Sequence, residues 1–203
     1  MVRQPFLKLP HTFEELRISL NKRKDKFESV NLYFQDESRF GLMSHMGSCI
    51  SAKGVRPVIH YSHKFSSTYL YGSYSPIDGS SFVWEVNGVS TQIFEAYLKA
   101  LSEHRPTEFK IVVIDNAGFH STKNITVPDN IYLLNIPPYT PELNPCEQVW
   151  AHIKTRFKNQ VFNTMEKLRE WLVQRVQSMD QQTILSITAN HRYIKQFNAT
   201  FNT

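Results

Sequence analysis

Three short apolar runs constrain the fold of this chain more than any other feature of its sequence. They are VNLYF at residues 30–34, KIVVI at 110–114 and IYLLNI at 131–136. Runs of this length, rich in β-branched and aromatic residues, are typical of strands buried on both faces of a sheet. The first two runs are followed closely by acids, so their strands are expected to deliver carboxylates to the edge of the sheet.

The segments between these runs predict a hairpin and several helices. Two β-rich stretches, Ser67–Pro76 and Ser80–Val86, are separated by a short turn and predict the hairpin. An amphipathic helix is expected to begin at Ser90, and two more at roughly Pro145–Lys158 and Thr164–Ser178. This order of elements predicts an α/β protein with a mixed sheet flanked by helices.

The length of 203 residues suits one domain with a substantial core. The segment from Thr12 to Glu15 fits a capping box that opens a short helix, so residues 1–30 are expected to form a linker or docking helix. Residues 31–203 are expected to form the main domain. The tail from Thr188 onward has no clear pattern and is left unassigned.

The net charge of +5 is unevenly distributed. Residues 1–30 carry +3 (seven basic, four acidic), residues 31–147 carry −3 (eight basic, eleven acidic), and residues 148–203 carry +5 (eight basic, three acidic). Basic flanks around an acidic middle suit a nucleic-acid enzyme, with cations for phosphates and carboxylates for metal. Solvated lysines on a helical surface would explain the basic tail equally well.

No apolar run in the sequence is long enough for a membrane span, and the N-terminus lacks the apolar core of a signal peptide. A soluble intracellular protein is therefore expected. The two cysteines, Cys49 and Cys146, show no spacing that suggests a disulfide framework. Free buried thiols are therefore favoured over a Cys49–Cys146 bridge.

Three acids are candidates for a metal site. Asp36 and Asp115 each follow an apolar run, and strand ends are where α/β sheets place their ligands. Two carboxylates at one sheet edge would make half of a divalent-metal site, because Mg²⁺ prefers oxygen ligands. Glu147 could supply a third ligand, or it could complete a capping box with Asn144 ahead of Pro145. Helix rules alone leave both roles open.

Three blocks of the sequence together resemble a known family. They are FQDESRFGL (Phe34–Leu42), VIDNAGFHST (Val113–Thr122) and PPYTPELNPCEQVWAHIK (Pro137–Lys154). These blocks resemble the signatures of DDE transposases of the mariner superfamily, particularly its bacterial insertion-sequence branch. The resemblance implies a ribonuclease H-like fold, with Asp36, Asp115 and Glu147 as catalytic, metal-binding acids.

The resemblance also implies a chemistry. It implies DNA strand cleavage and strand transfer with two Mg²⁺ ions, for which Mn²⁺ can substitute. The implied active complex is a homodimer that acts on transposon ends and target DNA. The implied location is the nucleoid in the bacterial cytoplasm, with no membrane as partner. Such transposases carry helix-turn-helix modules before the catalytic domain, and the 30 residues ahead of NLYF are too few to hold one. A ribonuclease H-like nuclease that cuts without joining, and a catalytically silent DNA-binding remnant, are the alternatives.

Further residues are candidates for site support or DNA contact. Asn116 and His120 match the second block, with a turn former and a helix cap as the respective structural alternatives. Lys154 and Lys158 follow Glu147 on roughly the same helical face, where they could contact DNA phosphate or simply be solvated. The neighbouring acid Glu37 should point to the other side of the strand. A zinc site at His60 and His63 is disfavoured, because their metal-like spacing comes without cysteine partners.

Overall fold

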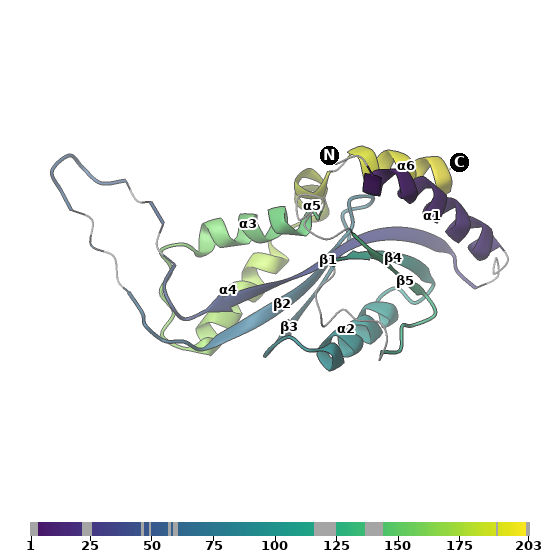
Figure 1. The fold of residues 1–203 in the computed structure, drawn as a ribbon. Coiled ribbons are helices and arrows are strands. Elements are labelled where there is room, and N and C mark those ends of the chain that lie inside the picture. Colours follow the sequence, from purple (N-terminus) through teal and green to yellow (C-terminus); the bar gives the residue numbers. More distant parts are fainter. Residues whose placement is uncertain are drawn as a thin grey trace.

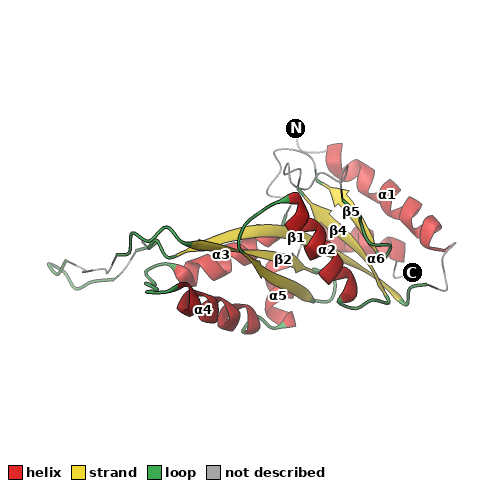
Figure 2. Ribbon diagram, turned by 90° about the horizontal axis from the view of Figure 1, so that it is seen from below, coloured by secondary structure: helices red, strands yellow, loops and turns green. Residues whose placement is uncertain are grey.

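A computed structural model describes residues 4–21, 26–45, 47–48, 50–56, 58, 61–115, 125–136, 144–189 and 191–201. The described part of the chain forms one five-stranded sheet and six helices (Figures 1 and 2). The strands are β1 (Ser29–Gly41), β2 (Ser67–Tyr74), β3 (Ser81–Val86), β4 (Glu108–Ile114) and β5 (Ile131–Asn135). The helices are α1 (Gln4–Asn21), α2 (Thr91–Glu103), α3 (Cys146–Phe157), α4 (Met165–Gln177), α5 (Gln181–Thr188) and α6 (His191–Phe201).

The sheet is mixed, as the sequence predicts. Its strand order is β3-β2-β1-β4-β5. The β2 strand pairs antiparallel with both β1 and β3, whereas β1, β4 and β5 run parallel to one another. The central strand β1 therefore joins an antiparallel hairpin on one side to a parallel pair on the other.

Helices cover both faces of this sheet (Figure 1). The α2 helix packs alone on one face, where its buried side chains contact Tyr33, Tyr71 and Val112. The other five helices contribute to one larger core on the opposite face, which includes Leu32 and Phe34. Side chains of a strand alternate between faces, so neighbouring residues of β1 serve two different cores.

The N-terminal helix is longer than predicted. It begins at Gln4 rather than at Thr12 and continues through Pro10. The fully buried Phe13 packs edge-on against two rings of α6, with centroids 6.2 Å from Phe197 and 5.9 Å from Phe201. Because most helical stability in proteins comes from tertiary packing, this contact explains how the helix runs past a local stop signal. Figure 2 shows α1 and α6 at the same end of the molecule.

The first strand is also longer than predicted. The sequence places Asp36 after the end of its strand, but β1 continues to Gly41. The parallel pairing with β4 ends at Phe34, whereas the antiparallel pairing with β2 runs from Phe34 to Gly41. The second half of β1 thus pairs with β2 and not with β4, which the sequence of β1 by itself does not indicate.

The turn between β2 and β3 contains a glycine that the fold requires. Gly79 has a φ of +72°, which L side chains rarely adopt. A Cβ atom there would lie 2.9 Å from the carbonyl carbon of Gln181, at the start of α5, and nearer still to its oxygen. Both the backbone angle and the contact with α5 therefore exclude a side chain.

We expect Gly79→Ala to lower the free energy of unfolding by roughly 2 kcal/mol, since the left-handed conformation costs an L residue about 1–2 kcal/mol and the contact adds to it. The matched control is Gly54→Ala, where φ is +84° but no atom lies within 4 Å of the new Cβ. Denaturant unfolding of both variants checks the prediction. An equal loss in the two would show that the α5 contact contributes nothing.

Candidate active site

The strand register brings two of the predicted acids to one edge of the sheet. The last residues of β1 and β4 that pair are Phe34 and Val113. Counting two residues onward from each reaches Asp36, within β1, and Asp115, directly after β4. Asp36 is therefore past the end of β4 rather than past the end of its own strand. Parallel strands deliver these residues in the same direction, so the edge beyond β4 carries both acids.

The first turn of α3 is attached to this part of β1 by hydrogen bonds. The side-chain amide of Asn144 donates to the carbonyl oxygen of Gln35 at 3.0 Å. The thiol of Cys146 donates to the carbonyl oxygen of Phe34 at 2.9 Å. Both side chains are buried, so the contacts are shielded from water. They hold the start of α3 beside the residues that precede Asp36.

A third contact from α3 reaches the acid itself. The indole Nε1–H of Trp150 donates to a carboxylate oxygen of Asp36 at 3.1 Å. Trp150 is 4% exposed and packs edge-on against Tyr74, with ring centroids 5.7 Å apart. A buried ring with a single donor fixes the orientation of the carboxylate it contacts. Trp150 stands in the third sequence block, but sequence reasoning did not assign it this role.

Burial and neighbouring charge act on Asp36 together. The pKa of Asp36 is raised to about 7, first by burial and then by the charges of Glu37, Asp115 and Glu147, against a backbone hydrogen bond that lowers it. Burial also raises the pKa of the Cys146 thiol, to which the charges of Asp36 and Glu147 contribute. Asp115 and Glu147 therefore both act electrostatically on Asp36.

Glu147 does not form the capping box that helix rules allow. The N-cap position of α3 is Pro145, without a side-chain cap hydrogen bond. The side-chain oxygen of Asn144 instead accepts from the backbone N–H of Cys146 at 3.0 Å, while its amide is used by Gln35. Asn144 thus satisfies a backbone N–H at the start of α3 with its oxygen and joins that start to the sheet with its amide. Glu147 is exposed in the first helical turn, where the helix dipole favours a carboxylate.

The chemistry of this edge suits a hard divalent cation. The groups that act on one another there are carboxylates, and Mg²⁺ prefers oxygen ligands. Within the described ranges, no cluster of three or more His, Cys, Asp or Glu side chains is arranged to hold a metal ion. Asp115 and Glu147 are nevertheless near enough to Asp36 to raise its pKa, and a cation bound between these carboxylates would remove the repulsion among them.

The two predicted lysines line a basic pocket at the other end of α3. A cavity of about 110 Å³ is bordered by Arg39, His45, Lys154, Phe157 and Lys158. The ammonium of Lys154 lies 5.9 Å from the ring centroid of Phe40. Arg39 comes from the end of β1, so a third permanent cation joins the lysines. Sequence reasoning missed Arg39, because its proximity depends on the extra length of β1.

Several predicted residues have other outcomes. Asn116 and His120 lie outside the described residues, as do Cys49 and His60. Cys146 is a free, buried thiol, as predicted. Glu37 accepts a hydrogen bond from the side chain of Gln35 at 2.6 Å, and residues two apart in a strand share a face. This agrees with the prediction that Glu37 points away from Asp36.

None of the helices in the described part of the chain combines the length and apolar character that a bilayer-spanning segment requires.

The strand order, the mixed pairing and the helices on both faces define the ribonuclease H-like class of fold, as predicted. The sequence profile of the family described as DDE superfamily endonuclease matches residues 31–169. The chain belongs to this family. The resemblance drawn from the three sequence blocks is thereby confirmed, and the bacterial insertion-sequence branch stays a prediction.

Among curated proteins, the uncharacterized protein y4pE/y4sA of Sinorhizobium fredii is 28% identical over 102 residues, which cover 49% of this chain and 76% of that protein. Among solved structures, the mariner Mos1 paired-end complex with Mg has a TM-score of 0.63 at 18% identity, covering 98% of this chain and 61% of that chain. The Mos1 paired-end complex with Mn has a TM-score of 0.61 at 16% identity, covering 98% and 62%. This chain therefore spans less than two thirds of the Mos1 chains it matches.

Proposed function

We propose that this chain is the catalytic part of a transposase, of the bacterial insertion-sequence branch, that performs metal-dependent DNA strand cleavage and strand transfer. Asp36, Asp115 and Glu147 would hold two Mg²⁺ ions, with Mn²⁺ able to replace them. The observation that supports this is the raised pKa of Asp36, to which burial and the charges of both other acids contribute. Paired-end complexes of Mos1 with Mg and with Mn support the choice of metals.

Each residue of the site has a role that follows from its position. When bound, two divalent ions would activate an attacking water and later a 3′-hydroxyl, and stabilise the leaving oxygen. Asp36, Asp115 and Glu147 would hold the ions through their carboxylate oxygens. Trp150 orients the carboxylate of Asp36 by donating to one of its oxygens. The hydrogen bonds of Asn144 and Cys146 to β1 keep the start of α3, and with it Glu147, at the edge of the sheet.

DNA would be held by charge rather than by sequence. The basic pocket formed with Arg39, Lys154 and Lys158 would contact backbone phosphates on the same side of α3 as Glu147, toward the other end of the helix. Its substrates would be transposon ends and target DNA, as in the Mos1 complex with the left transposon end, so the enzyme would act at the nucleoid in the bacterial cytoplasm. Residues 31–203 would form the catalytic domain, and residues 1–30 a docking helix, consistent with the packing of α1 on α6.

The active complex would be a homodimer. The connection between β1 and β2 extends away from the sheet (Figure 1). Its apolar side chains Ile50, Val58 and Phe65 are 104%, 90% and 78% exposed. Exposed apolar side chains in such numbers mark interaction surfaces, and a second copy of the chain is the partner proposed for them.

The test of this function uses a supercoiled plasmid as target and a short duplex with free 3′-hydroxyl ends as donor. With Mn²⁺ or Mg²⁺ we expect plasmid nicking together with covalent joining of the labelled donor, and neither product in chelator. Nicking without joining would favour the nuclease that cuts but does not join. A plasmid left unchanged under every metal condition would contradict the proposal.

A further inference from the structure

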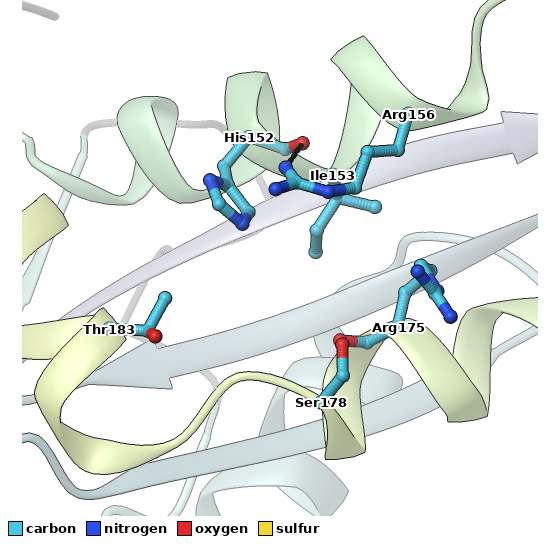
Figure 3. A pocket seen from close by; sticks show the side chains of 6 residues that line it. All are labelled: His152, Ile153, Arg156, Arg175, Ser178 and Thr183. Carbon is cyan, nitrogen blue, oxygen red and sulfur yellow. Dashed lines mark hydrogen bonds between the residues drawn. The ribbon is translucent and has the colours of Figure 1, made fainter.

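A second pocket lies between three helices on the five-helix side of the sheet (Figure 3). It is bordered by residues from α3, α4 and α5, and by the residue that follows α4. Its volume of about 160 Å³ is room for roughly five water molecules at about 30 Å³ each. The lining residues are His152, Ile153, Arg156, Arg175, Ser178 and Thr183.

The pocket is basic and rich in hydrogen-bond donors. Arg156 and Arg175 are permanent cations with several N–H donors each. The hydroxyl of Ser178 already donates to the carbonyl oxygen of Arg175 at 2.8 Å. The side chain of Thr183 hydrogen-bonds to Asp180. Burial and the charge of Arg156 lower the pKa of His152. No acidic residue is found among the lining residues that the structure describes.

The two arginines are not neutralised by the protein. Arg105 and Arg169 form ion pairs with carboxylates, whereas neither Arg156 nor Arg175 does so within the described residues. The guanidinium of Arg156 donates to the carbonyl oxygen of His152 at 3.1 Å, which uses one of its five N–H groups. Figure 3 shows this guanidinium beside the His152 ring, at the border of the pocket.

Arg175 has a donor that is left without an acceptor. Its Nε–H is buried and meets no hydrogen-bond partner among the described residues. Its guanidinium carbon lies 5.9 Å from the ring centroid of Trp171, a contact that orients the group but accepts no hydrogen bond. Buried donors of charged groups are normally satisfied, so this one indicates that an acceptor belongs in or beside the pocket.

The carboxylate nearest in sequence to Ser178 and Thr183 already accepts a hydrogen bond within the protein. Asp180 is the N-cap of α5 and accepts a hydrogen bond from the backbone N–H of Thr183 at 2.8 Å. It therefore serves the helix and is not one of the residues that border the pocket.

The pocket is separate from the acids. Residues of a helix are 100° apart, so Arg156, nine positions after Glu147, lies on the opposite side of α3 from it. Lys154, seven positions after Glu147, lies almost directly above it. A phosphate bound in this second pocket would therefore not belong to the DNA strand that the basic pocket at Lys154 contacts.

We propose that this pocket binds a backbone phosphate of DNA outside the reacting strand, through Arg156 and Arg175. Arginine recognises phosphate oxygens with paired N–H groups and is a common phosphate contact. The volume admits a phosphate group and its water but not a nucleoside, which favours the backbone over a base. The inference rests on the proposed function for the choice of DNA as the source of the phosphate.

The test measures binding of a short DNA duplex in chelator, so that cleavage does not enter. The variants are Arg156→Gln, Arg175→Gln and their combination. The control is Lys167→Gln, which removes an equal charge from an exposed position of α4 that does not border the pocket. We expect the double variant to reduce the slope of log K against log salt by about 1, equally for different sequences, while the control changes it less.

Melting curves with inorganic phosphate as the probe distinguish a DNA backbone phosphate from free phosphate as the ligand of the pocket. An unchanged slope, together with stabilisation by phosphate that the double variant loses, would overturn the backbone assignment in favour of free phosphate. An unchanged slope without such stabilisation would overturn the pocket as an anion site. Arg156→Gln alone, at an exposed position, guards against misfolding in Arg175→Gln. Because the metal-dependent joining assay is separate, either result leaves the proposed catalytic function to be judged on its own.

Discussion

Asp36→Asn is expected to abolish metal-dependent cleavage and, in chelator at pH 8, to make the protein more stable. The loss of activity should be on the order of 10³-fold, because metal ions supply several kcal/mol of transition-state stabilisation and each 1.36 kcal/mol is a factor of ten. The stability gain follows from the pKa of Asp36, which burial first and neighbouring acids next raise from 3.8 to about 7. The amide keeps an oxygen to accept from Trp150, so the local geometry should survive.

The sign of the effect on stability depends on pH. A folded-state pKa above the unfolded value means that the folded protein holds its proton more tightly than the unfolded chain does. The stability that this contributes is complete below about pH 4 and is lost as pH rises through 7. The asparagine of the variant does not titrate, so the advantage of the variant should grow by roughly 2–3 kcal/mol between pH 5 and pH 8.

Melting curves at the two pH values, in chelator, measure this difference. Glu170→Gln, which removes an exposed carboxylate from α4, is the control and should show no such growth. An advantage of Asp36→Asn that stays the same at both pH values would show that the folded protein does not raise the pKa of Asp36. Metal-dependent cleavage that survives in Asp36→Asn would remove this residue from the catalytic set.

Elements with complete local signals could be predicted from the sequence. The α2 helix begins where Ser90 accepts a hydrogen bond from the backbone of Ile93 at 3.2 Å, and its apolar stripe is buried as expected. The α4 helix likewise begins after Thr164, which caps it. Sequence reasoning leaves the α6 helix unassigned, although its apolar Tyr193 and Phe197 stand four residues apart, as on one helical face, and both are buried. Their partners lie on β1 and α1, far away in the sequence.

The site shows the same division between local and distant information. The positions of Asp36 and Asp115 relative to apolar runs were visible, but the length of β1 depends on β2. The side chain of Asn144 looked like a helix cap, because capping is its commonest local use. Its oxygen does accept from the backbone N–H of Cys146, but its amide also donates to the backbone of Gln35, 109 residues away. Local sequence signals do not determine which strand the start of a helix will contact, so the attachment of α3 to β1 is seen only in the structure.

Gly72 lies opposite Asp36 in the antiparallel pairing of β1 and β2, and it leaves room for Trp150. A Cβ atom at this position would lie 2.6 Å from Tyr74 Cε2 and 2.8 Å from Trp150 Cη2. Tyr74 is fully buried and Trp150 is 4% exposed, so neither ring can move outward into solvent. The side chain of an alanine there must therefore displace one of the rings or the strand itself.

Gly72→Ala is expected to lower the free energy of unfolding by about 3 kcal/mol, at the upper end of overpacking effects in well-packed cores. For a chain of this size, that loss corresponds to a fall in Tm of roughly 6–12 °C. Gly88→Ala is the control, since no atom lies within 4 Å of the Cβ it would add. Equal melting temperatures for the two variants would contradict the described packing of Trp150 over β2.

The same substitution should also weaken metal-dependent cleavage under conditions where the variant is fully folded. Displacing the Trp150 ring moves the Nε1–H that holds the Asp36 carboxylate, and a misplacement of about 1 Å can cost a hundredfold in rate. A double-mutant cycle with Trp150→Phe separates the two effects. If Gly72 acts on Asp36 through the indole, removing the donor first should leave Gly72→Ala with little further effect on the rate, because residues in contact are not additive. A full additional loss of rate in the double variant would instead show that β2 affects the site by a route that does not include Trp150.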